Sequence, residues 1–147
     1  MKRRLIYGLL VCLFVCLTNV LFAKDINSNA DWSSVSPSDE VTIKMSGTTT
    51  LPSDITCKKI QFEQNNTILD LNGHNLTVTG DLYMKDRTGL KIINGGDIFV
   101  GGNFEMKSQN GVVSVDRVSV TGNLYMQDQT GMSITADIAV GGDFYMK

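Results

Sequence analysis

The 147-residue sequence predicts an all-β fold, a single-stranded parallel β-helix (β-solenoid) of roughly five coils with about 20 residues each. One observation is a repeat: four six-residue segments begin with glycine, carry methionine in the fifth position and end with lysine or glutamine. Their first residues are Gly80, Gly102, Gly122 and Gly142, so the segments recur once per coil. The other observation is a strict alternation of apolar and polar residues around each glycine, which indicates strands.

Residues 1–23 have the pattern of a secretory signal peptide. Three basic residues, Lys2 to Arg4, precede an apolar stretch that runs with little interruption from Leu5 to Phe22. Ala23 supplies the small residue expected before a cleavage site, and a polar run follows it. The apolar stretch is close to the roughly 18 residues that a membrane-spanning helix needs, so an uncleaved anchor is the alternative. We expect cleavage after Ala23.

The segment 24–40 is expected to form a lead-in and an N-terminal cap. The stretch from Asp31 to Asp39 has no strand pattern, and Trp32 is expected to cover the open end of the first coil. The β-helix is expected over residues 41–147, with degenerate repeats before Gly80. Lys147 lies at the position where the three earlier repeats enter a turn. We therefore expect no C-terminal cap after the last strand. Because exposed strand edges pair with other chains, we expect either a truncated product or an end covered by end-to-end self-association.

Successive coils of a solenoid lie about 4.8 Å apart, so like residues should stack into ladders. Antiparallel hairpins are the alternative arrangement, but hairpins do not require each strand to resemble the strand two positions along the chain. We expect the four repeat glycines at the bend between two faces of the coil, where a side chain would crowd its neighbours. The three predicted interior ladders are Val78, Val100, Val120 and Val140; Leu82, Phe104, Leu124 and Phe144; and Met84, Met106, Met126 and Met146. The two surplus residues of the longest repeat are expected around Asn94 to Gly96.

Two outward rows are the candidate surface features. The first row is Asp81, Asn103, Asn123 and Asp143. Since two amides separate its carboxylates, we interpret it as a row that hydrogen-bonds along the stack rather than as an acid pair or calcium site. The second row is Tyr83, Glu105, Tyr125 and Tyr145. Its tyrosines could bind sugars or protein strands through their flat faces, or could stabilise the sheet by cross-strand stacking.

No catalytic residue, metal site or cofactor is predicted. His74 has no second histidine or free cysteine nearby in the sequence to complete a zinc site. Cys57 is the one cysteine that follows the predicted signal peptide, which leaves no internal disulfide, and we expect it to be buried in a strand.

The run from Thr67 to Gly80, leading into coils of the form Gly, Asp or Asn, Leu or Phe, any residue, Met, resembles right-handed parallel β-helix repeats of large secreted bacterial proteins. Such proteins include adhesins, filamentous-haemagglutinin-like passengers and pectin-lyase-like enzymes. The resemblance covers residues 41–147. It implies the architecture rather than one activity, because the same solenoid hosts adhesion, carbohydrate cleavage and scaffolding.

These features predict a secreted or cell-surface structural or adhesive module without catalytic activity, located outside the cell or in the periplasm. The alternative is the N-terminal part of a polysaccharide-degrading enzyme. Signal removal takes Lys2, Arg3 and Arg4 from the 13 basic residues and leaves 10 against 15 acidic ones. This net negative charge argues against nucleic acid or a membrane surface as partner. Glycans and host or cell-surface proteins are the expected partners.

Overall fold

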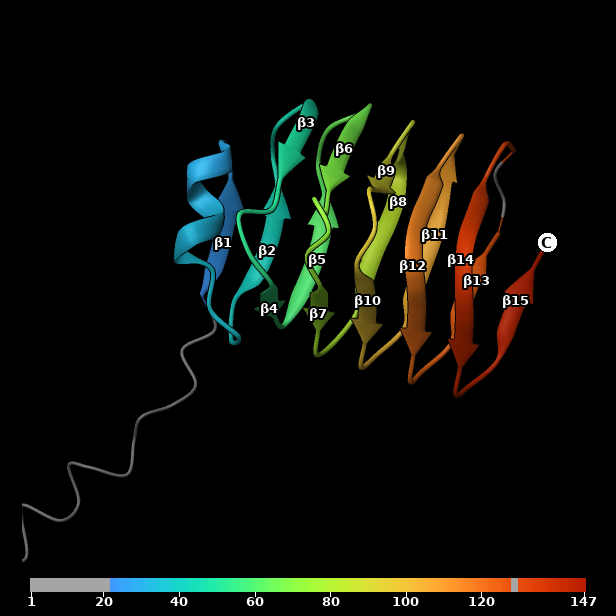
Figure 1. Ribbon diagram of the computed structural model, residues 1–147. Helices are drawn as coiled ribbons and strands as arrows, with labels where there is room; N and C mark the ends of the chain where they lie inside the picture. Colours follow the sequence, from blue (N-terminus) through green and yellow to red (C-terminus); the bar gives the residue numbers. More distant parts are fainter. Residues whose placement is uncertain (1–21, 128–129) are drawn as a thin grey trace, which may run out of the picture.

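The computed structural model describes residues 22–127 and 130–147 and shows an all-β parallel solenoid of about six turns (Figure 1). This confirms the predicted fold class. The predicted signal peptide lies outside the described residues, except for Phe22 and Ala23.

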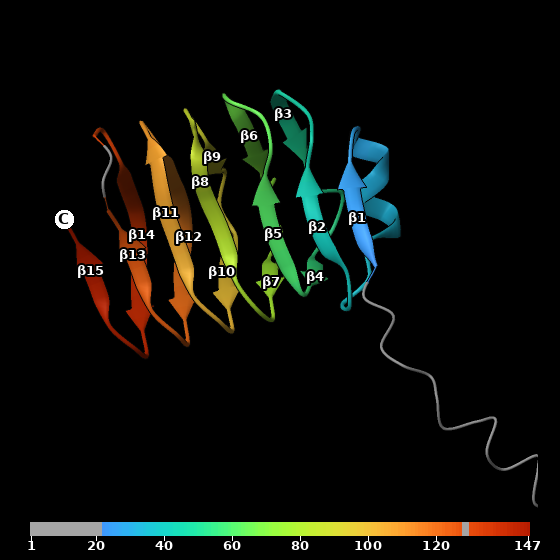
Figure 2. The ribbon, with the colours of Figure 1, turned by 180° about the vertical axis from the view of Figure 1, so that it is seen from behind.

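One side of the solenoid is a parallel sheet of seven strands, here called sheet A, which faces the viewer in Figure 2. Neighbouring strands of this sheet belong to successive coils, so sheet A presents one strand from each coil. Its strands, in spatial order, are β1 (Ala23–Ile26), β2 (Glu40–Ile43), β5 (Lys59–Phe62), β8 (Leu82–Thr88), β11 (Phe104–Gln109), β13 (Leu124–Met126) and β15 (Phe144–Met146).

The remaining strands form sheet B, which is bent into two halves. Strand β12 pairs with β9 through residues 112–114 and with β10 through residues 117–120, so the bend lies between these stretches. A complete coil therefore has three sides: one in sheet A and one in each half of sheet B. The strands of sheet B are β3 (Gly47–Thr50), β4 (Ile55–Cys57), β6 (Thr67–Asp70), β7 (Leu76–Val78), β9 (Lys91–Ile93), β10 (Asp97–Val100), β12 (Val112–Val120) and β14 (Ser133–Val140).

The three interior ladders are in the predicted register: each member pairs with its counterpart in the next coil. From Val78 to Met126 these side chains are buried, as β-branched, leucine and methionine side chains from three sides fill the centre of each coil. In the last coil Phe144 is 47% exposed and Met146 is 73% exposed.

The two surplus residues of the longest repeat do not lie together, contrary to the expectation from the sequence. Lys85 pairs with Lys107, whereas Thr88 pairs with Gln109, so the first extra residue lies between these two pairs. It is accommodated beside Asp86, whose φ of 59° marks a bulge. The second extra residue lies in the loop between β9 and β10. Before this loop Lys91 pairs with Val112, 21 residues later, and after it Asp97 pairs with Arg117, 20 residues later.

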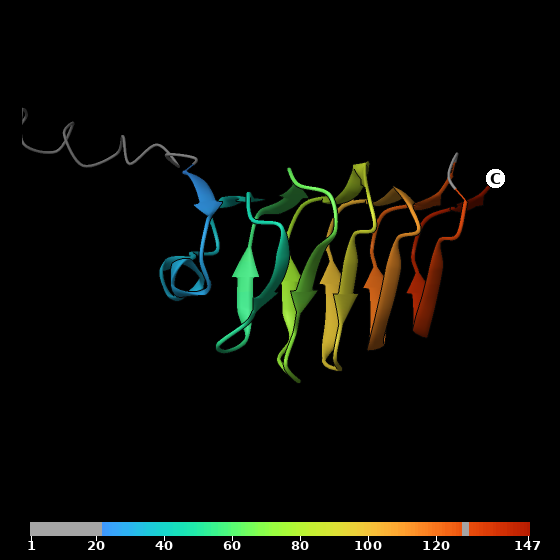
Figure 3. The same ribbon diagram turned by 90° about the horizontal axis from the view of Figure 1, so that it is seen from above.

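The segment predicted as lead-in and cap adds a strand to the stack, which raises the number of turns from roughly five to about six. Strand β1 pairs in parallel with β2 through residues 23–26. A 3₁₀-helix, η1 (Asn29–Ser34), follows and lies at the N-terminal end of the solenoid (Figure 3). Its Trp32 is fully buried, and the indole Nε1 donates a hydrogen bond of 2.7 Å to Oγ1 of Thr49 in β3.

Candidate functional site

The outward row of Asp81, Asn103, Asn123 and Asp143 forms a chain of hydrogen bonds along the stack. The backbone N–H of each later member donates to Oδ1 of the member before it, over 2.7, 2.9 and 2.8 Å. The side chains lie at the corner where sheet B leads into sheet A, directly after the four repeat glycines. Their oxygens thus satisfy backbone donors that the turn leaves outside the strand ladders, as the sequence suggested.

The tyrosine hydroxyls are tied to this same row. Tyr83 donates to Oδ2 of Asp81 at 2.8 Å, and Tyr145 donates to Oδ2 of Asp143 at 2.9 Å. In the coil between them, Nδ2 of Asn123 donates to the hydroxyl oxygen of Tyr125 at 2.8 Å. Each tyrosine is therefore held by the residue two positions before it, on the same outer face of the strand.

The tyrosine rings lie against their neighbours in the sheet. The rings of Tyr125 and Tyr145 are stacked, with centroids 4.9 Å apart and planes 3° from parallel. The ammonium groups of Lys59 and Lys85 lie 5.2 and 4.2 Å from the centroid of the Tyr83 ring. Because ligands that stack on aromatics need a free ring face, these contacts favour the sheet-stabilising interpretation of the row over flat-face binding of sugars.

Charged side chains complete the outer face of sheet A. Glu105, which interrupts the tyrosine row, accepts a hydrogen bond of 3.1 Å from Lys85 and lies 3.8 Å from Lys107. The hydrogen bond to Asp81 raises the pKa of Tyr83 to about 12, with desolvation adding to the shift. The pKa of Tyr145 is likewise raised by its hydrogen bond to Asp143. Tyr83 and Tyr145 therefore stay protonated as hydrogen-bond donors over the physiological pH range.

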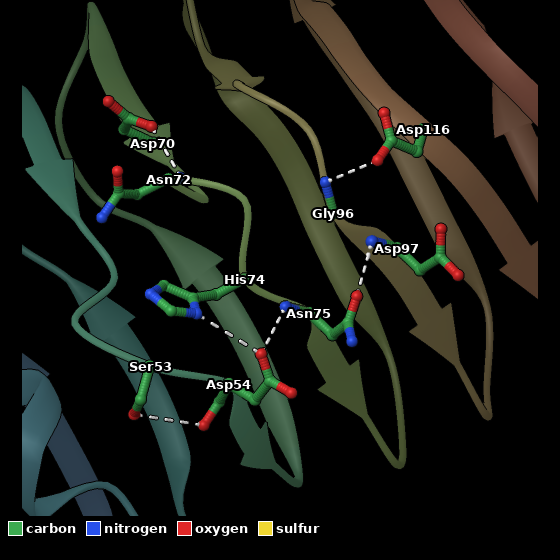
Figure 4. A network of polar contacts seen from close by, with 9 residues as sticks. All are labelled: Ser53, Asp54, Asp70, Asn72, His74, Asn75, Gly96, Asp97 and Asp116. Atoms are coloured by element: carbon green, nitrogen blue, oxygen red, sulfur yellow. Dashed lines mark hydrogen bonds and ion pairs between the residues drawn. The ribbon is translucent and has the colours of Figure 1, made fainter.

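A second row of this kind lies at the bend within sheet B (Figure 4). The backbone N–H of Asn75 donates to Oδ1 of Asp54 at 2.9 Å, and that of Asp97 donates to Oδ1 of Asn75 at 2.9 Å. His74 lies beside this row, with Nδ1 3.5 Å from Oδ1 of Asp54. Sequence reasoning missed this row, because its members do not follow a repeated glycine. The recurrence of Asp or Asn at matching positions of three successive coils was the available signal.

Cys57 is buried in β4, opposite Val78, and desolvation raises its pKa to about 12. Its thiol thus takes a place in the valine ladder and is held in the unreactive form. Across residues 22–127 and 130–147, no group of three or more histidine, cysteine or acidic side chains is arranged to hold a metal ion.

Within those same residues, no helix has the length and apolar character needed to span a membrane. No family model matches the chain, and no curated protein or solved structure is significantly similar to it.

Proposed function

We propose that this chain is a structural and adhesive β-solenoid module that acts outside the cytoplasm and carries out no catalysis. The observation that supports this role most strongly is that the polar side chains on sheet A bind one another and neighbouring coils. Hydrogen bonds join neighbouring coils through Asp81, Asn103 and Asn123, and Tyr83 donates to Asp81. Glu105 forms ion pairs with two lysines. Side chains committed to such contacts stiffen a rod that can carry a binding surface.

The proposed export is compatible with the first strand. Cleavage after Ala23 leaves Lys24, Asp25 and Ile26, which pair with Val41, Thr42 and Ile43 of β2. The proposal predicts an exported chain whose N-terminal residue is Lys24. Mass spectrometry of the protein recovered from the medium or from the cell surface tests this, and a chain that retains residues 1–23 would contradict the export step.

The absence of catalysis is tested with the polysaccharides that a lyase or hydrolase of this architecture would cleave. The purified protein is incubated with polygalacturonate and with neutral plant and bacterial polysaccharides, and unsaturated and reducing ends are measured. We expect retention of the protein on immobilised glycans or on cell surfaces with no release of new ends. Release of new ends at a rate proportional to protein concentration would overturn the proposal in favour of an enzyme.

The contribution of the tyrosine row to adhesion is measured separately. Changing Tyr83, Tyr125 and Tyr145 together to Phe removes the hydroxyls and keeps the rings, whereas changing them to Ala removes both. The rings and hydroxyls make contacts within the sheet. We therefore expect both triple variants to unfold at a lower urea concentration than the wild-type protein and still to adhere. Loss of adhesion in a triple variant with unchanged stability would assign the row a direct role in binding.

A further inference from the structure

The second half of sheet B carries an aromatic side chain in a setting unlike that of the tyrosines. Phe99, on the outer face of β10, is 38% exposed. Its neighbours in register are Thr77 in β7 and Ser119 in β12, both short side chains. The ring therefore lacks the stacked partner that Tyr125 has in Tyr145.

A shallow groove lies beside this ring. It has a volume of about 300 Å³ and is lined by the outer faces of β7, β10 and β12 together with the residues that follow them. Gly101 forms part of the floor, between the exposed Thr79 and Thr121 of the adjacent coils. A β-carbon at Gly101 would collide with the carbonyl oxygen of Thr79, so the depression at this point is built into the backbone packing.

The chemistry of the lining selects a class of ligand. The groove is lined by threonine, serine, glycine, valine and phenylalanine, all uncharged. On the same strands, Asp97 and Arg117 lie 4.0 Å apart and offset each other, and Asp116 of β12 adds a negative charge. An anionic ligand therefore gains little here, whereas a neutral sugar presents an apolar C–H face for the ring and hydroxyls for the exposed threonines.

We propose that this groove is a binding site for a neutral polysaccharide, with one sugar ring on Phe99 and its neighbours hydrogen-bonded to Thr79 and Thr121. The Thr79 hydroxyl donates to the carbonyl oxygen of Cys57 at 3.3 Å, so it accepts a hydrogen bond from the sugar. Two coil spacings separate these threonines, about 10 Å, which accommodates a disaccharide unit lying along the solenoid. The inference rests on the proposed adhesive function and locates it on sheet B instead of on the tyrosine row. The proposed binding involves no change in covalent bonds.

The test uses the purified protein and four hexasaccharides: the neutral cello-, xylo- and mannohexaose, and the acidic hexagalacturonate. Binding is measured by isothermal titration calorimetry. We expect at least one neutral hexasaccharide to bind more tightly than hexagalacturonate, and Phe99→Ala to weaken that binding about tenfold or more, as expected for loss of a central aromatic contact. Thr121→Val, which keeps the side-chain shape and removes the hydroxyl, should weaken it by a smaller factor.

The matched control is Tyr145→Ala, which removes an aromatic side chain of similar exposure, 40%, from sheet A. It should leave hexasaccharide binding unchanged. Far-ultraviolet circular dichroism verifies that each variant is folded. Failure of every neutral hexasaccharide to bind, equal binding by the Phe99→Ala variant, or a preference for hexagalacturonate would overturn the inference.

An adhesion assay on cell and glycan surfaces separates this inference from the proposed function. If the wild-type protein adheres and Phe99→Ala adheres equally well, the groove is not the binding site and the adhesive function stands. If the wild-type protein adheres to none of the surfaces, the proposed function itself fails.

Discussion

Alanine at Gly122 tests whether the corner between sheet B and sheet A admits any side chain. A β-carbon there would lie 2.6 Å from the carbonyl oxygen of Gly102 and 2.7 Å from Oδ1 of Asn103, far inside normal contact distances. These two oxygens accept the backbone N–H groups of Gly122, at 3.0 Å, and Asn123, at 2.9 Å. Relief of the collision by separating the coils therefore weakens both hydrogen bonds.

The expected cost follows from these contacts. Two weakened hydrogen bonds contribute about 1 kcal/mol each, and overpacking of a close backbone contact adds roughly 1–3 kcal/mol. We expect Gly122→Ala to lower the free energy of unfolding by about 3–5 kcal/mol, measured by urea denaturation followed by circular dichroism.

Gly73→Ala is the matched control, because a β-carbon at that position would meet nothing within 4 Å. Its backbone φ of +77° still disfavours alanine, at a cost of about 1 kcal/mol. A Gly122→Ala variant within about 0.5 kcal/mol of wild type, or a Gly73→Ala variant that loses as much, would refute the collision as the reason for glycine at this corner.

Three further predictions concern groups whose environments the structure defines. Trp32→Phe removes the 2.7 Å hydrogen bond to Thr49 and leaves that hydroxyl buried without its indole partner, so urea denaturation should show a loss of about 1–3 kcal/mol; unchanged stability would contradict the capping role. Because the pKa of Tyr83 is raised to about 12 in the folded chain, its stabilising contribution is complete below the unfolded-state pKa of about 10 and is lost as pH rises toward 12. Ultraviolet titration should therefore show a late-ionising tyrosine that moves to lower pH in Asp81→Ala, and ionisation of all tyrosines together near pH 10 would exclude the bond in solution. The Cys57 thiol, whose burial raises its pKa to about 12, should resist a thiol-specific reagent at about pH 8 until the protein is unfolded; rapid labelling of the folded chain would show that β4 opens.

The sequence predicted the parts of the fold that recur. Val78, Leu82 and Met84 share the same intervals to their counterparts, and in a solenoid an interval shared by several positions is equivalent to a register. The first strand was missed because Ala23 to Ile26 has one fully buried residue, Ile26, and no glycine before it, so it shares no pattern with the later coils.

Side-chain orientation was the part of the candidate site that the sequence could not supply. The spacing of Tyr125 and Tyr145 placed them in one row, and the structure adds that their rings stack on each other. Likewise, the partner of Trp32 depends on where η1 lies against β3, which no repeat determines.

The contrast between Tyr125 and Phe99 indicates where a repeat protein of this kind gains a binding surface. A side chain that recurs in consecutive coils lies about 4.8 Å from its own copies, so its faces and polar atoms are used within the stack, as the Tyr125–Tyr145 pair shows. A large side chain that interrupts a row of short ones keeps its surface free, as Phe99 does between Thr77 and Ser119. The repeated positions therefore hold neighbouring coils together, and the proposed binding surface is best sought at positions where one coil departs from its neighbours.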